Sequence, residues 1–214
     1  MKFTALTLLA TLSFSASAQG VYLSHYVFPE FVKGTVLKKS GSREQALLNY
    51  NSLTQEMIFE NNGQKLALAQ LNTIDTVYIR HSKFVPVDST FFEVINTNSY
   101  PLYVRHKTRL EIPGTPIGYG TSTQSASATS LSSYSKAALG RTIYDLKLPD
   151  NYKLKPQTEF FVKRNNRFIR INGAGSLSKI FPGKEKNIRD FANKNRPDFT
   201  RKEDLVTLLN YLTN

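Results

Sequence analysis

The chain contains no cysteine, and this absence excludes several kinds of chemistry at once. Without thiols there is no disulfide bond, no thiolate metal site, no cysteine nucleophile and no lipid-anchored bacterial cysteine. Histidine is scarce as well, because His25, His81 and His106 are the only three and lie far apart in the sequence. Three scattered histidines leave few ligands for zinc. We therefore expect neither a metal nor a cofactor.

The familiar catalytic signatures are also missing. There is no G-x-S-x-G, H-E-x-x-H, Walker or C-x-x-C motif. A Ser-His-Asp site stays open as a hypothesis, because such triads assemble in space rather than in sequence. Hydrolysis of a glycan would need two carboxylates across a cleft, for which Glu56, Glu60, Glu93 and Glu111 are candidates. The sequence itself identifies no catalytic residue.

The first eighteen residues are predicted to be a secretory signal. Lys2 gives a positive start, an apolar run extends from Ala5 to Phe14, and Ala16-Ser17-Ala18 places small residues at the cleavage site. A buried N-terminal helix is the alternative. A membrane anchor is disfavoured, because the run is shorter than the roughly 20 residues that span a bilayer, and no later stretch is apolar enough. We expect cleavage before Gln19 and export to the periplasm or outside the cell.

Residues 19–112 are predicted to form a β-rich body, because short β-rich runs alternate with turn residues. Pro86 confines its strand to a sheet edge or its own position to a strand end, since proline donates no backbone hydrogen bond. The run from Leu102 to Ile112 alternates apolar and polar residues, with His106 on the apolar face. A half-buried, hydrogen-bonded histidine is the favoured interpretation there. We expect an antiparallel meander that curls into a sandwich, a roll or a partly open barrel.

One hairpin in this body has a predicted register. Asn62-Gly63 favours a two-residue turn, because both positions accept positive φ. Glu60 then faces Lys65, and Phe59 faces Leu66. An opposite-charge pair followed by an apolar pair supports the assignment.

Residues 113–139 are rich in Ser, Thr and Gly, bury little, and are interpreted as a loop or linker, with a mobile lid as the alternative. Residues 140–214 are predicted to form a β-hairpin and short C-terminal helices. Asn165-Asn166 marks the turn of the hairpin, and Thr200 to Glu203 matches a capping box for the last helix. The predicted fold class is therefore α+β. Helical spacing gives core stripes that comprise Leu177, Ile180, Phe181, Ile188, Phe191, Ala192, Leu205, Leu208, Leu209 and Leu212.

Positive charge is the one compositional anomaly. The chain has 28 lysines and arginines against 16 acids, a formal charge of +12. Residues 160–202 contain twelve basic and three acidic residues, with phenylalanines between them. The predicted hairpin places Phe160 and Val162 on one face with Ile169 and Ile171, and Phe161, Lys163, Phe168 and Arg170 on the other. If this stretch binds an anion, the Lys163/Arg170 face is the best candidate, and the candidate binding residues of the hairpin are Lys163, Arg164, Arg167 and Arg170. The alternative is a solvated basic surface that aids solubility.

Several short motifs together resemble an uncharacterised family of secreted and periplasmic proteins from Bacteroidetes-type bacteria. The resemblance implies export and a β-rich body, and it transfers no catalytic residue. It rests on Lys33–Val36, Ala46–Asn51, Gln55–Phe59, Asn62-Gly63, Phe84–Val87, Phe91–Val94 and Gly118–Gly120.

Two classes of function follow from these patterns. We favour a non-catalytic envelope or secreted protein that binds anionic envelope polymers or lipid head groups through its basic C-terminal region. The alternative is a small secreted hydrolase that acts on cell-wall or glycan material. The predicted signal argues against intracellular nucleic acid as the partner.

The signal can be tested by the N-terminus of the protein after expression in a Gram-negative host. We expect intact-mass measurement to find Gln19 as the first residue in the exported fraction, because the small residues precede it. A protein that keeps Met1 and stays in the cytosol would contradict export.

Overall fold

The structure is a computed structural model, and it describes residues 25–98, 100–111, 116–117, 121–122 and 153–212. The predicted signal, its cleavage site and most of the predicted 113–139 linker lie outside these residues. Two short strands, β10 (Pro116–Ile117) and β11 (Thr121–Ser122), pair with each other inside the predicted linker.

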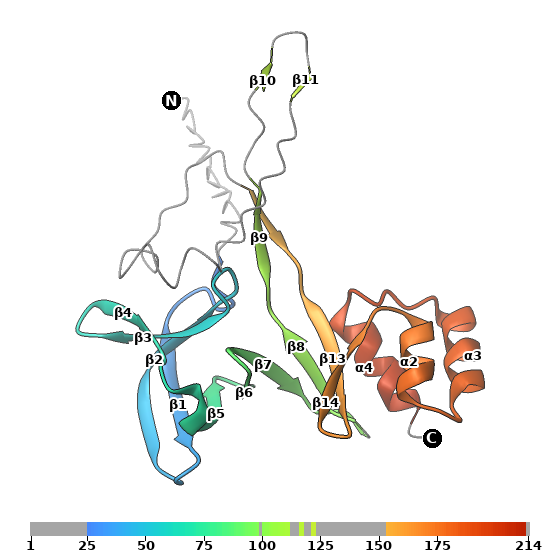
Figure 1. Ribbon diagram of the computed structural model, residues 1–214, viewed down its shortest axis with the longest axis horizontal. Coiled ribbons are helices and arrows are strands. Elements are labelled where there is room, and N and C mark those ends of the chain that lie inside the picture. The colour runs from blue at the N-terminus through green and yellow to red at the C-terminus, as the bar shows by residue number, and fades with distance from the viewer. Residues whose placement is uncertain (1–24, 99, 112–115, 118–120, 123–152, 213–214) are drawn as a thin grey trace, which may run out of the picture.

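The main body is one antiparallel sheet of ten strands (Figure 1). Its strands along the chain are β1 (Val32–Lys38), β2 (Arg43–Asn51), β3 (Glu56–Asn61), β4 (Gln64–Ala67), β5 (Ile74–Ile79), β6 (Ser82–Val87), β7 (Thr90–Ile95), β8 (Leu102–Arg105), β13 (Glu159–Arg164) and β14 (Arg167–Ile171). Their order across the sheet is β14-β13-β8-β7-β6-β5-β1-β2-β3-β4. The chain thus returns after β4 to pair β5 with β1, and the C-terminal hairpin joins the sheet at β8.

The remaining elements extend or cover this sheet. A separate two-stranded sheet lies beyond β8 and β13 (Figure 1). It consists of β9 (Thr108–Glu111), which follows β8 in the chain, and β12 (Lys153–Pro156), which precedes β13. Three helices follow β14, and this arrangement confirms the α+β class and the antiparallel meander. The helical elements are the 3-10 helix η1 (Leu71–Thr73), α2 (Ala174–Ile180), α3 (Glu185–Asn195) and α4 (Lys202–Tyr211).

Both predicted hairpins have the expected register. Glu60 faces Lys65 and Phe59 faces Leu66 across β3 and β4. Asn62 and Gly63 both take positive φ in the turn between them. In the second hairpin, Asn165 and Asn166 also take positive φ between β13 and β14. These turns form because asparagine and glycine tolerate the left-handed conformation that tight hairpins require.

The first seven strands form a curled, open sheet in which β3 also lies against β7. Gly34 permits this curl in the middle of β1. A Cβ atom there would lie 2.5 Å from the Tyr78 carbonyl oxygen and 2.8 Å from Leu48. Polar bonds then hold the open side together: the Tyr50 hydroxyl lies 2.9 Å from that of Thr90, which donates to the Gln55 carbonyl oxygen. The sheet is therefore closed by side chains where no strand pairing closes it.

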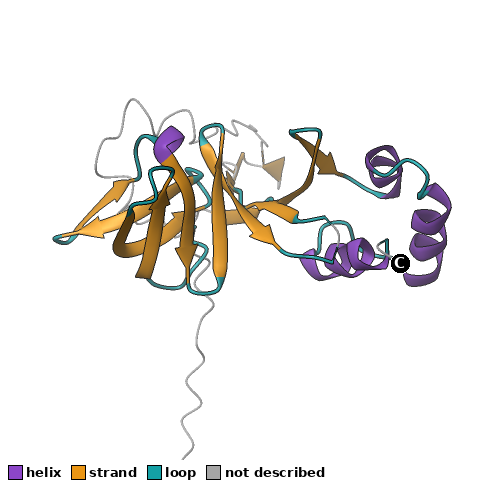
Figure 2. Cartoon of the chain, turned by 90° about the horizontal axis from the view of Figure 1, so that it is seen from below, coloured by secondary structure: helices purple, strands orange, loops and turns teal. Residues whose placement is uncertain are grey.

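Two hydrophobic clusters lie on the sheet. The first fills the curl of β1 to β7, and its buried members are Val36, Leu48, Tyr50, Met57, Ile74, Val77, Ile79, Phe84 and Phe91. The second joins β8, β13 and β14 to the helices, which gather at one end of the sheet (Figure 2). It buries all but one of the predicted helix-stripe residues, since Ala192 is half-buried.

The prediction for Pro86 is confirmed. Pro86 is the last residue but one of β6, and β5 pairs with β6 only as far as Phe84. Proline is tolerated because no ladder bond to β5 is needed there, and Pro86 pairs with Phe91 of β7 alone.

The predicted capping box is wrong. Arg201, not Thr200, is the residue that precedes α4, and no side chain caps the helix. The Thr200 hydroxyl instead donates to the Asp198 carboxylate at 2.6 Å. Asp204, in the first turn of α4, accepts from the Asp198 backbone N–H at 2.8 Å. The acid in the first turn therefore anchors the preceding loop rather than the cap.

Among the described residues, no helix is both long enough and apolar enough to cross a membrane.

The terminal helix provides a stability test. Leu208 is fully buried between the helices and the sheet. We expect Leu208→Ala to lower the free energy of unfolding by about 2–5 kcal/mol, because it leaves a cavity. Thr200→Ala, at an exposed residue of the loop before α4, should cost about 0.5 kcal/mol or less. Denaturant midpoints at equal slope measure both, and a neutral Leu208→Ala would contradict the docking of α4 on the sheet.

Candidate functional site

The sheet face opposite the helices carries alternating aromatic and basic side chains on the C-terminal hairpin. Pairing sets Phe161 against Arg170 and Lys163 against Phe168. Residues that face each other across two strands point to the same side of a sheet. This register is the one expected from the sequence. We call this side of the hairpin and of its neighbours β7 and β8 the outer face.

Four aromatic rings from four strands contact one another on the outer face. Phe92 of β7 stacks on Phe161 of β13, with ring centres 5.0 Å apart, and meets Phe168 of β14 edge-on at 5.2 Å. Tyr103 of β8 meets Phe168 edge-on at 4.9 Å. Phe92 and Phe161 are buried, whereas Tyr103 and Phe168 are half-buried. The cluster thus has a covered base and a partly exposed rim.

Cationic groups lie over these rings. The Arg105 guanidinium is 5.4 Å from the centre of Phe161, and the Lys163 ammonium is 5.5 Å from that of Phe168. Such contacts are attractive because the ring face is electron-rich. Arg105 and Arg170 both pair with the buried carboxylate of Glu159, with Arg105 Nε at 2.6 Å and Arg170 at 3.0 Å. One carboxylate therefore faces two guanidinium groups, and the outer face keeps a net positive charge.

The four basic residues predicted as an anion site do not form one cluster. Lys163 and Arg170 lie on the outer face, both exposed. Arg164 lies on the helix side and donates to the Ile180 carbonyl oxygen at the end of α2. Arg167 faces Arg164 in the pairing and is exposed. The structure thus brings together two of the four residues.

Sequence reasoning missed the contribution of the neighbouring strands. Phe92, Tyr103 and Arg105 join the outer face only because β8 pairs with β13, with Tyr103 opposite Phe161. The alternation of Tyr103 and Arg105 on the polar side of their strand was a visible signal. No signal in the sequence indicated their neighbours across the sheet, because strand pairing between distant segments has no local signature.

Most of the basic residues in the C-terminal region form no ion pair with an acidic side chain. Residues 160–202 all belong to the described part of the chain, and two of their twelve lysines and arginines form ion pairs there. These pairs are Arg170 with Glu159 and Lys186 with Asp190, the latter at 2.7 Å on the surface of α3. The positive charge of this region is therefore only slightly neutralised within the chain.

A second polar cluster lies on the opposite side of the sheet, where the two hydrophobic clusters meet. The Glu93 carboxylate of β7 accepts from the Ser82 hydroxyl at 2.7 Å and lies 2.7 Å from Nε2 of His106. Burial alone raises the pKa of Glu93, but the hydrogen bonds from His106 and Ser82 and the His106 charge outweigh it. The pKa of Glu93 is therefore held below its ordinary value.

The order of groups in this cluster differs from that of a catalytic triad. Ser82 bonds to the carboxylate rather than to the histidine, so this serine is not placed for activation by His106. His106 also packs against the stacked Tyr50 and Phe84 rings, with its ring centre 6.3 and 6.4 Å from theirs. The structure thus confirms His106 as a half-buried, hydrogen-bonded residue that links β8 to β7.

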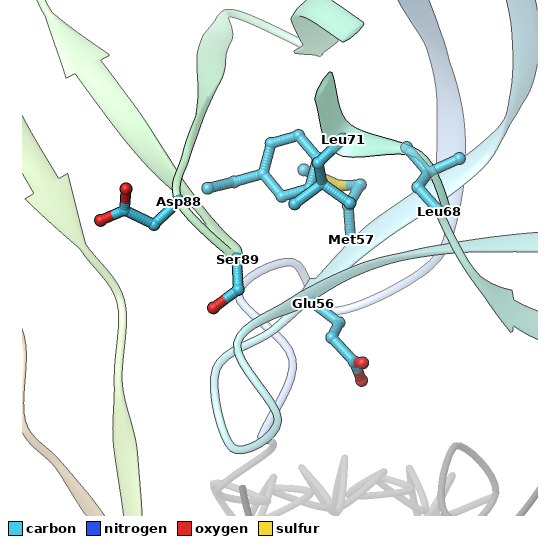
Figure 3. Close-up of a pocket in the computed structure, with 7 residues that line it drawn as sticks. Glu56, Met57, Leu68, Leu71, Asp88 and Ser89 are labelled. Atoms are coloured by element: carbon cyan, nitrogen blue, oxygen red, sulfur yellow. The ribbon is translucent and has the colours of Figure 1, made fainter. Parts of the chain in front are cut away.

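Among the glutamates considered for hydrolysis, the three whose side chains the structure describes, Glu56, Glu60 and Glu93, do not come together as a pair. Glu93 is bound to His106, Glu60 faces Lys65, and Glu111 lies in β9. Glu56 lines a pocket that also contains Asp88, but the two carboxylates point in different directions (Figure 3). Within the described ranges, no three histidines, aspartates or glutamates are grouped as a metal site would require.

Comparisons of the chain with protein family models, with curated proteins and with solved structures give no match. The resemblance to secreted Bacteroidetes-type proteins therefore stays a prediction.

The Glu93 cluster generates a pH-dependent prediction. A carboxylate whose pKa is lower in the folded state stabilises the fold above its ordinary value of 4.5 and loses that contribution as pH falls through its folded pKa. We expect Glu93→Gln to lower the free energy of unfolding by about 1–3 kcal/mol at pH 7, since a buried hydrogen-bonded charge is lost. The difference from wild type should shrink below pH 4.5.

Glu60→Gln is the matched control, because Glu60 faces Lys65 near the tip of an exposed hairpin. We expect it to change the unfolding free energy by about 0.5 kcal/mol or less at either pH. Denaturant titrations from pH 3.5 to 7 measure both variants. An equal loss for Glu93→Gln at all pH values would contradict the electrostatic origin.

Proposed function

We propose that the protein is an exported, non-catalytic binding protein whose outer face binds anionic polymers of the cell envelope. The observation that carries this proposal is the alternation of cations and aromatic rings on β13 and β14. Lys163 and Arg170 are exposed there, and Phe168 and Tyr103 are half-buried beside them. A face of this kind offers charge to an anion and flat apolar area to the rest of the ligand.

The spacing of the two cations favours a polymer over a free ion. Lys163 and Arg170 are diagonal neighbours on adjacent strands, which places their backbones roughly 7–8 Å apart. Two exposed cations on adjacent strands, with the rings of the outer face beside them, suit successive anionic groups along a chain better than one small anion. The rings between them would contact the units that carry those groups. Acidic glycans and phosphorylated lipopolysaccharide have this chemistry.

The rest of the C-terminal region supports the same partner. Exposed, unpaired cations on the helices would attract a polyanion over a wide area, and neutralising them would release counterions. Lys179, Lys194 and Arg196 are exposed examples on or next to α2 and α3. Such binding is broad in specificity and sensitive to salt, as expected of an envelope protein that meets repeating polymers.

Export is part of the proposal and rests on the N-terminal sequence. A positive start, a short apolar run and small residues before Gln19 are typical of a secretory signal. An exported protein meets anionic glycans and lipids rather than intracellular nucleic acid. The periplasm and the cell exterior both contain such polymers.

The proposal is tested by titrating the protein with heparin, a sulfated glycan, at 50 and 200 mM salt. We expect Lys163→Gln/Arg170→Gln to bind at least about threefold more weakly and to show a shallower salt dependence, because two polymer contacts are lost. Lys39→Gln/Arg43→Gln is the matched control, since both residues are exposed at the β1–β2 end and the change in net charge is the same.

Equal weakening by the two variants would contradict a specific outer face and leave net charge as the cause. Binding without salt dependence would contradict recognition of a polyanion. Vesicles of anionic phospholipid form a second arm of the experiment. Stronger binding to the vesicles than to heparin would assign the surface to lipid head groups instead of polymers.

A further inference from the structure

A pocket opens on the curled part of the sheet, away from the outer face. Its volume is about 260 Å³, and it lies between β3, the segment after β4, η1 and the turn that joins β6 to β7 (Figure 3). The residues that line it are Glu56, Met57, Leu68, Leu71, Asp88, Ser89 and Phe91. None of them belongs to the C-terminal region with its excess of positive charge.

The pocket has an apolar floor and an acidic mouth. Met57 and Phe91 are each 1 % exposed and belong to the first hydrophobic cluster, while Leu68 and Leu71 are half-buried beside them. Figure 3 shows Glu56 and Asp88 on either side of Ser89, at the edge of this apolar group. An apolar floor with a few polar groups at its rim is the usual composition of a small-molecule site.

The walls of the pocket are held in place by the fold. Thr90, next to the β6–β7 turn, donates to the carbonyl oxygen of Gln55, the residue before Glu56. Gln55, Gln70 and Asp88 all have left-handed backbone conformations, with φ of 60°, 53° and 53°. Non-glycine residues adopt this conformation uncommonly. Three such residues at the borders of one pocket indicate that the backbone conformation fixes the shape of the pocket.

The charge at the mouth is opposite to that of the whole protein. The chain has a formal charge of +12, yet the lining includes two acids and no lysine or arginine. A cation is repelled by most of this protein and attracted at this mouth. An anion is attracted elsewhere and repelled here. The pocket therefore discriminates by charge against the polyanions proposed for the outer face.

We propose that this pocket binds a small amphiphilic cation, an apolar body of about one side chain in size that bears an ammonium group. The body packs against Met57, Leu68, Leu71 and Phe91. The ammonium lies at the mouth, where the Glu56 and Asp88 carboxylates point in different directions and attract it through their negative potential rather than as a joint pair of ligands. The volume limits the ligand, because it is close to the lower end of the range for small-molecule sites. Alkylamines and aromatic amines have the required chemistry.

The test uses n-hexylammonium as the probe, with 1-hexanol and hexanoate as its neutral and anionic analogues. Met57 is an internal reporter, because Met1 is the only other methionine in the chain. We expect hexylammonium at pH 7 and low salt to shift the ¹³C-methyl NMR signal of Met57 in a saturable manner. Hexanol should bind several-fold more weakly, and hexanoate should produce no saturable shift.

The variant Glu56→Gln/Asp88→Asn should raise the dissociation constant of hexylammonium about fivefold and remove the preference over hexanol. Asparagine tolerates the positive φ of residue 88, so the turn is preserved. Glu44→Gln/Asp75→Asn is the matched control, since both acids are exposed and outside the pocket. It should leave the affinity unchanged.

Two outcomes would overturn the proposal. One is the absence of any saturable Met57 shift with hexylammonium. The other is equal binding of hexanol and hexylammonium by the wild-type protein, a comparison that needs no variant. Heparin binding by the Glu56→Gln/Asp88→Asn variant should be unchanged or slightly stronger, so this result is independent of the outer face.

Discussion

The pairing of β8 with β13 is the constraint on which the rest of the structure depends. It joins segments more than fifty residues apart, with Val104 opposite Phe160 and Tyr103 opposite Phe161. One side of this pair enters the cluster that the helices cover, and the other side forms the outer face. A slip of β13 by one residue along β8 would turn Phe161 under the helices and Phe160 to the outer face, while Tyr103 kept its side. The packing of the helices and the proposed binding surface therefore both depend on the register of β8 with β13.

Polar side-chain contacts hold together parts of the sheet that strand pairing does not join. The curl of β1 to β7 is held by the bonds of Tyr50 and Thr90 across its open side. Burial raises the pKa of Tyr50, so its hydroxyl stays protonated and able to donate. Where the two hydrophobic clusters meet, Glu93 and His106 hold β7 to β8. Buried polar groups of this kind stabilise one arrangement when every partner is present.

Hairpin turns and helix stripes were predictable from the sequence, whereas the pairing of strands distant in the sequence was not. Asn62-Gly63 and Asn165-Asn166 determine their hairpins because only the turn and its neighbouring residues are involved. The leucine stripe of α4 is likewise a periodic pattern within one element. The capping box failed because Asp198 competes for the Thr200 hydroxyl. The contribution of Arg105 to the outer face and the pocket around Met57 depend on contacts between strands that the sequence does not order.

The most direct test of this account is a cross-strand disulfide in a chain that has no cysteine of its own. Tyr103→Cys/Phe161→Cys places two thiols opposite each other across β8 and β13. Tyr103→Cys/Val162→Cys is the control, because residue 162 points to the helix side. The account predicts that mild oxidation links the first pair within one molecule and leaves the control reduced. Crosslinking of the control pair alone, or of neither pair, would contradict the register on which the outer face is built.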